Sequence, residues 1–129
     1  MPTPLPDAEQ DVLAALYDLE EAAASDVRQA LATRRPLTHS SIVTLLMRLE
    51  KRGLVRRRKA DVGKAFLFRP TRPRARVFGP ALARLLDRAF AGRPVDAVAS
   101  FFESTPPTRE ELADLEQLVK TLRQNRPSR

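Results

Sequence analysis

The residues best suited to binding chemistry lie between Pro36 and Pro70, where small polar side chains precede a run of cations. Small hydroxyl-bearing side chains allow close approach to the edges of bases, and guanidinium and ammonium groups neutralise phosphates. This order of residue types predicts a DNA-binding surface. Its expected members are Thr38, His39, Ser40, Ser41, Val43, Thr44, Arg48, Lys51, Arg57, Lys59 and Lys64, and Arg56 and Arg58 are expected to add phosphate contacts.

The distribution of charge agrees with this prediction. The formal net charge of the 129 residues is +7, but residues 34–93 alone carry 17 bases against 3 acids. The preceding 33 residues carry 7 acids against 1 base, and the segment after residue 93 is almost balanced. A basic block between acidic and neutral segments predicts a local positive surface that attracts a polyanion.

Several classes of site are excluded by composition. The chain has no cysteine, so disulfides, zinc–thiolate sites and thiol catalysis are ruled out. The single His39 cannot form a histidine-rich metal cluster, and neither a metal nor a cofactor is expected. No run of 18 apolar residues occurs and the first residues do not resemble a signal peptide, so a cytoplasmic protein is expected.

Catalysis is not expected either. Glu111 and Asp114 share one side of a predicted helix, but carboxylates at that spacing normally solvate the helix. Ser40 and Ser41 have no evident partners that could act as a base and orient it, and His39 at a helix start suits a phosphate or solvent contact better. Only four glycines occur, each alone, so there is no glycine-rich phosphate loop.

Three predicted helices position the binding residues. Apolar spacing predicts a first helix over residues 8–19 with Asp7 as its N-cap, and a second that opens at Ser25 and Asp26 and ends at 34–36. Thr38 is predicted to cap the third helix and Gly53 to terminate it. One side of the third helix is apolar and should face the core, through Ile42, Leu45, Leu46 and Leu49.

A basic β-hairpin is predicted directly after this helix. Residues 54–59 and 65–69 are predicted to form two short strands, and the turn between them contains Gly63. Phe66 and Phe68 are both expected to seat the hairpin on the helices, and Pro70 is expected to end it. The predicted fold is mostly α with a small β-hairpin, a winged helix-turn-helix DNA-binding domain over residues 1–70.

Residues 71–129 are predicted to form a helical dimerisation domain. A kink or restart is expected at Gly79–Pro80, and Thr108 with Glu111 forms a predicted capping box. These helices are too few to make a good independent core, so they either fold back on the first domain or pair with a second copy. Pairing is preferred, through Phe78, Leu82, Leu85, Leu86, Phe90, Val98, Phe101, Phe102, Leu112, Leu115, Val119 and Leu122.

Short motifs along the whole chain resemble the BlaI/MecI/CopY family of penicillinase-repressor-type winged-helix regulators. The matching pieces are Pro6-Asp7-Ala8-Glu9, the pattern Ser41-Ile42-x-Thr44-x-Leu46-x-Arg48-Leu49 with Gly53, the wing Gly63-Lys64-Ala65-Phe66-x-Phe68-x-Pro70, and Val98-x-x-Phe101 with Glu110-Glu111-Leu112-x-x-Leu115. The resemblance implies a homodimeric repressor on a pseudo-palindromic operator, with the third helix in the major groove. By position, Ser40, Ser41 and Thr44 would face bases, and Arg48 would contact a base or phosphate.

The chain also departs from this family. Ser40 stands where lysine is frequent, and Gln10 and Leu37 stand where tryptophan is frequent. In members that respond to β-lactams, the resemblance implies a regulatory protease acting near Ser100–Phe101, but Ser100 stands where asparagine is usual. The cysteine cluster of copper-responsive members is absent, which rules out that mode of sensing copper. An alternative function also stays open, a winged-helix adaptor that binds protein rather than a specific DNA sequence, because the outer face of the third helix carries little charge.

Overall fold

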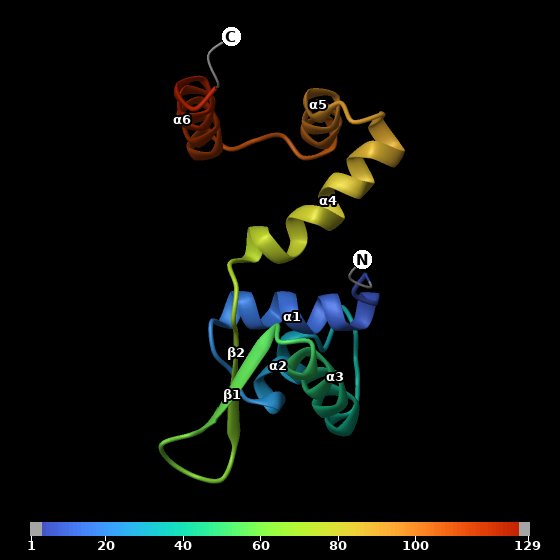
Figure 1. Ribbon diagram of the computed structural model, residues 1–129, viewed down its shortest axis with the longest axis vertical. Coiled ribbons are helices and arrows are strands. Elements are labelled where there is room, and N and C mark those ends of the chain that lie inside the picture. The colour runs from blue at the N-terminus through green and yellow to red at the C-terminus, as the bar shows by residue number, and fades with distance from the viewer. Residues whose placement is uncertain (1–3, 127–129) are drawn as a thin grey trace. The chain divides into compact units, whose positions relative to one another are not determined.

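The computed structural model describes residues 4–126 and divides into two compact units, residues 1–81 and 82–129. The described residues form six helices and one two-stranded hairpin. This mostly helical fold confirms the predicted class. Figure 1 shows the first three helices gathered beside the hairpin, within the first unit. The division lies beyond the boundary expected at Pro70, because the residues that follow the hairpin still pack against the first helix.

Helix α1 spans Asp7–Leu19 and buries Val12, Leu13 and Leu16 in the core. Asp7 is not its N-cap, contrary to the prediction. The cap position is Pro6, whose carbonyl oxygen accepts a 2.9 Å hydrogen bond from the Gln10 amide. Asp7 is itself helical, and its carboxylate instead adds negative charge to the first turn, where the helix dipole favours it.

Helix α2 spans Ala24–Ala30 and is shorter than expected. The Asp26 carboxylate accepts a 3.0 Å hydrogen bond from the Ala23 amide, which satisfies a backbone donor at the helix start. The helix ends before the predicted stop at residues 34–36, and turns fill the interval. Val27 and Leu31 remain buried on this side of the core.

Helix α3 spans His39–Lys51 and agrees closely with its prediction. The Thr38 hydroxyl caps it by accepting a hydrogen bond from the Ser41 amide at 3.2 Å. Gly53 adopts a φ of 78°, and the Leu54 amide donates to the Leu49 carbonyl at 3.0 Å, so a glycine turn closes the helix. The expected apolar side is buried, as Ile42, Leu45, Leu46 and Leu49.

Strands β1 (Val55–Lys59) and β2 (Phe66–Pro70) pair antiparallel, with Val55 opposite Pro70 and Lys59 opposite Phe66. Phe68 is buried, and its backbone exchanges two hydrogen bonds with Ala22, at 2.8 and 3.0 Å, which fastens the hairpin to the segment after α1. Phe66 is 41% exposed, so the expectation that both rings seat the hairpin is wrong for Phe66. Lying nearer the turn, Phe66 extends past the core.

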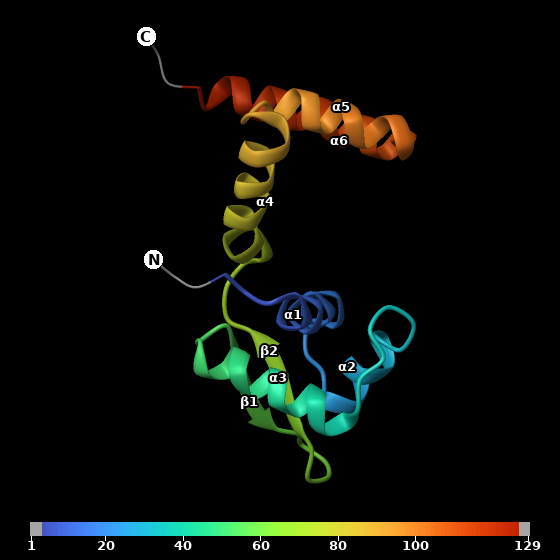
Figure 2. The ribbon, with the colours of Figure 1, turned by 90° about the vertical axis from the view of Figure 1, so that its right-hand side faces the viewer.

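The remaining helices are α4 (Arg74–Phe90), α5 (Pro94–Ser104) and α6 (Arg109–Gln124). Helix α4 continues through Pro80 rather than restarting there. The predicted capping box of α6 is confirmed, because Thr108 and Glu111 exchange hydrogen bonds of 3.0 and 3.1 Å between side chain and backbone. Figure 1 shows α5 and α6 as separate helices joined by an extended segment, and the two ribbons overlap in the view of Figure 2. Within the described part of the chain, no helix is long and apolar enough to cross a membrane.

Candidate nucleic-acid interface

The side of α3 away from the core is exposed and carries little charge. Ser40, Thr44 and Met47 lie on this side and are exposed, and Val43 is half-buried at its edge. Arg48 and Lys51, in the last turn, bring cations to one end of the same helix. The first turn contains no acidic residue, so the positive end of the helix dipole is not neutralised by a carboxylate of that turn.

Hydroxyl groups on this helix are partly committed to the protein itself. Thr38 caps the helix and also donates to the Ser41 hydroxyl at 2.9 Å. Thr44 donates its hydroxyl hydrogen to the Ser40 carbonyl at 3.0 Å, which leaves its oxygen as an acceptor. The hydroxyls of Thr38 and Ser40 lie 3.3 Å apart. Of these four predicted contacts, Thr38 and Ser41 therefore serve chiefly to start the helix.

One of the predicted hairpin cations is held against α3. The Arg57 guanidinium lies 3.3 Å from the Glu50 carboxylate and 4.8 Å from the centre of the Phe66 ring. An arginine over an aromatic face gains both charge attraction and packing. Arg57 thus links α3 to the hairpin as well as contributing charge to the surface.

A second hairpin cation is paired with a carboxylate outside the hairpin. Arg58 donates two hydrogen bonds to Glu21, at 2.7 and 3.0 Å, and Asp61 lies 3.7 Å away. These hydrogen bonds from Arg58 lower the pKa of Glu21 and, reciprocally, Glu21 raises the pKa of Arg58. The sequence did not reveal this pairing, because 37 residues separate the partners.

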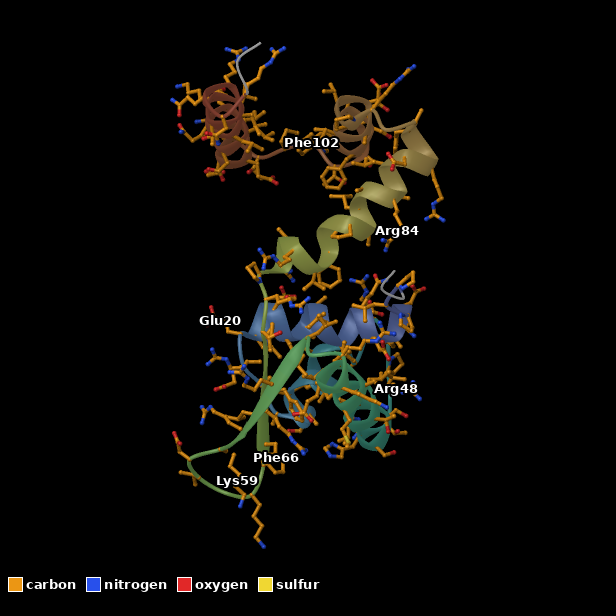
Figure 3. The ribbon with its side chains drawn as sticks, in the orientation of Figure 1. Glu20, Arg48, Lys59, Phe66, Arg84 and Phe102 are labelled. Carbon is orange, nitrogen blue, oxygen red and sulfur yellow. The ribbon has the colours of Figure 1, made fainter. Side chains whose placement is uncertain are left out.

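Five of the predicted cations on α3 and the hairpin have no acidic partner within 4 Å among residues 4–126: Arg48, Lys51, Arg56, Lys59 and Lys64. Figure 3 shows Arg48 on α3, and Lys59 where the hairpin approaches its turn. The strand register also sets Arg56 directly opposite Arg69, and like charges in that position repel.

A groove of about 270 Å³ lies between α3, the hairpin and the start of α2. Its α3 side is formed by His39, Val43 and Met47, which follow one another at intervals of four residues along the helix. The hairpin side includes Lys64 and Phe66. Met47 and Phe66 were not among the expected site residues, although the four-residue spacing from His39 is visible in the sequence.

The expected dimerisation residues fall into two environments. Phe78 lies against Tyr17 of the first unit, with ring centres 6.0 Å apart, and is half-buried there. The Tyr17 hydroxyl donates to the Arg72 carbonyl at 2.6 Å, and burial raises the pKa of Tyr17. The other members lie in the second unit and are exposed or half-buried: Leu82, Leu85, Leu86, Phe90, Val98, Phe101, Phe102, Leu112, Leu115, Val119 and Leu122.

Comparison with solved structures supports the winged-helix fold. The chain is similar to a mutant of MarR from Escherichia coli in complex with operator DNA, with 19% identity, a TM-score of 0.54, and coverage of 92% of this chain and 75% of that one. It is similar to the YusO protein of Bacillus subtilis, with 20% identity, a TM-score of 0.54, and coverage of 95% and 77%. Comparison with curated proteins gave no match.

Family membership rests on a match that spans most of the chain. Residues 5–121 match the penicillinase repressor family, and this segment includes all six helices except the end of α6, together with the whole hairpin. The resemblance drawn from the short motifs is thereby confirmed. The chain belongs to the penicillinase repressor family of winged-helix transcriptional regulators.

Proposed function

We propose that this protein is a homodimeric transcriptional repressor that binds a pseudo-palindromic operator through α3 and the hairpin. Family membership supports the general role of a repressor. The DNA-binding surface is supported mainly by five predicted cations on α3 and the hairpin that lack acidic partners among the described residues, Arg48, Lys51, Arg56, Lys59 and Lys64. Unpaired cations beside an exposed, capped helix favour phosphates flanking a major groove.

Homodimer formation is supported by the second unit. Its described residues include none that is buried, and large apolar side chains such as Leu82 and Phe101 are each 57% exposed. Leaving so many apolar side chains in water forfeits about 25 cal/mol for each Å² that a partner would cover. A second copy presents the same apolar stripes, and a two-fold pair sets two α3 helices on two half-sites.

Footprinting on the DNA upstream of the gene tests this proposal. We expect protection of two half-sites related by symmetry and separated by about one helical turn or a multiple of it. The affinity should fall steeply as salt rises, because phosphate contacts release counterions. A protein that binds no fragment in a salt-dependent way, yet retains a protein partner, would instead be the adaptor left open by the sequence.

Lys59→Ala tests whether Lys59 contacts a phosphate or only adds to the net positive charge of the protein. Removing one phosphate contact should weaken binding to all DNA sequences alike and reduce the slope of log K against log salt by about 0.9. Lys120→Ala, an exposed lysine on α6, is the matched control and should leave that slope unchanged. Thr44→Ala should relax specificity at one base position by about 1–3 kcal/mol without changing the slope.

A further inference from the structure

The groove between α3 and the hairpin is lined by apolar side chains that remain accessible. Met47 is 50% exposed and Phe66 is 41% exposed, and Val43 of α3 lines the groove and is half-buried. These three residues form the apolar strip. Covering large apolar side chains that are this exposed lowers the free energy, because their surface is removed from water. Methionine is also flexible enough to adapt its shape to the partner.

The chemistry around the strip indicates an anionic occupant. Among the groove-lining residues described, three can carry positive charge, namely His39, Arg57 and Lys64, and none is acidic. Arg48 and Lys51, on the same helix, have no acidic partner among residues 4–126. At about 270 Å³ the groove is also smaller than the roughly 300–1,000 Å³ of most small-molecule pockets. Nucleic acid matches the charge of this groove and does not need an enclosed pocket of that volume, so it is a better occupant than a small molecule.

Two hydroxyl groups at α3 use their hydrogens within the protein, so apolar side chains of this helix could take part in recognising bases. The hydroxyl hydrogens of Thr38 and Thr44 are donated within the protein, to the Ser41 hydroxyl and the Ser40 carbonyl. In the major groove of DNA, the one apolar group that distinguishes a base pair is the 5-methyl of thymine. An exposed methionine and a half-buried valine on a DNA-binding helix can pack against that methyl group, whereas they cannot form hydrogen bonds with base donors or acceptors.

We propose that Met47 and Val43 are specificity-determining residues that recognise thymine 5-methyl groups in each half-site. This inference rests on the proposed function and adds to it the chemical feature of the operator that α3 reads. Phe66 forms part of the hairpin side of this site, and the cations of the groove contact the phosphate backbone beside it.

Replacement of thymine by uracil tests the proposal without altering the protein. Each thymine of the footprinted operator is replaced in turn by uracil, which removes the methyl group and keeps every hydrogen bond. At one or two thymines per half-site, the affinity of the wild-type protein should fall about fourfold, which corresponds to about 0.8 kcal/mol for one buried methyl group. Wild-type protein that binds every uracil-substituted operator as tightly as the parent would overturn the inference while leaving DNA binding itself established.

Two variants then locate the contact. Met47→Ala or Val43→Ala should bind the thymine and uracil operators equally at the sensitive position, because the partner of the methyl group is gone. Lys51→Ala is the control, since it should weaken both operators alike and keep the fourfold difference. A difference that persists in both apolar variants would assign the methyl group to another residue and refute the proposal. Absence of binding to the parent operator would instead refute the proposed function.

Discussion

The two units of this chain use apolar residues in opposite ways. In the first unit, Leu13, Leu16, Ile42, Leu46 and Leu49 are fully buried, and the helices and hairpin close around them. In the second unit, α5 and α6 carry apolar side chains at helical spacing, yet no described residue from 82 to 126 is buried. The first unit thus has its own core within one chain, whereas the second leaves its apolar stripes uncovered within one chain.

This difference separates two kinds of stability. A unit with its own core unfolds with a free energy that does not depend on protein concentration. A unit whose apolar stripes are covered by another copy is stabilised by association, so its stability rises with concentration. The repressor proposed here needs both, because the first unit supplies the DNA contacts and the second holds two such units on one operator.

The largest expected effect comes from the core of the first unit. Leu46→Ala removes a fully buried side chain of α3 and should lower the free energy of unfolding by about 2–5 kcal/mol. Chemical denaturation at several protein concentrations should give the same loss each time. Leu118→Ala on α6, where the side chain is 51% exposed, is the matched control and should cost far less. Equal losses from the two variants would contradict the contrast between the units.

The next effect concerns the stripe of α6. Leu115→Glu places a carboxylate among Leu112, Val119 and Leu122, and should weaken dimerisation by about a hundredfold, or about 2.8 kcal/mol. Analytical ultracentrifugation measures this change. Gln117→Glu adds the same charge on the other side of α6 and should leave the dimer intact. A wild-type protein that stays monomeric at high concentration would show that the stripe is not a dimer interface.

How far the sequence predicted this structure depends on the range of the interaction. The caps of α3 and α6, the glycine turn at Gly53 and the buried side of α3 depend on residues within one or two turns, and all were predictable. The ion pair between Glu9 and Arg52, at 3.6 Å, joins the start of α1 to the end of α3, and nothing in local spacing marks it. Arg58 and Glu21 are a second case, since strand register and the Ala22–Phe68 bridge bring them together.

The same limit applies to the candidate interface. Residue types and order predicted which cations to expect on this surface, but not which of them already have a carboxylate partner. Phe66 and Phe68 show the reason. Both point to one side of the hairpin, yet only Phe68 lies near enough to the core to be buried, and that distance depends on where the hairpin leaves the helices.

Two threonine caps allow the same chemical change in both units. Thr38→Ala and Thr108→Ala each remove a hydroxyl that accepts a backbone hydrogen bond at a helix start, at a cost of about 1 kcal/mol. The loss at Thr38 should be independent of protein concentration, whereas the loss at Thr108 should appear in the dimerisation constant. Thr→Ser at either site retains the hydroxyl and should restore most of the stability. Concentration dependence at both sites would show that the first unit also depends on association.

The smallest effect tests whether the Arg58–Glu21 pair stabilises the first unit. Hydrogen bonds from Arg58 lower the pKa of Glu21, so the pair stabilises the fold above the ordinary glutamate pKa, and this contribution is lost as the pH falls through the lowered pKa of the folded state. Unfolding measured from neutral to acidic pH should therefore show wild type and Glu21→Gln converging in acid. Because the pair is solvent-exposed, added salt should also reduce their difference at neutral pH.

Glu20→Gln provides the control for that measurement. Glu20 adjoins Glu21 in sequence, is exposed, and has no ion pair among the described residues (Figure 3). Its replacement changes the net charge by the same amount and should leave the pH dependence of unfolding as it is in wild type. If Glu20→Gln flattened the pH profile as much as Glu21→Gln, the effect would come from net charge. The Arg58 contact would then have no part in holding the hairpin to the rest of the first unit.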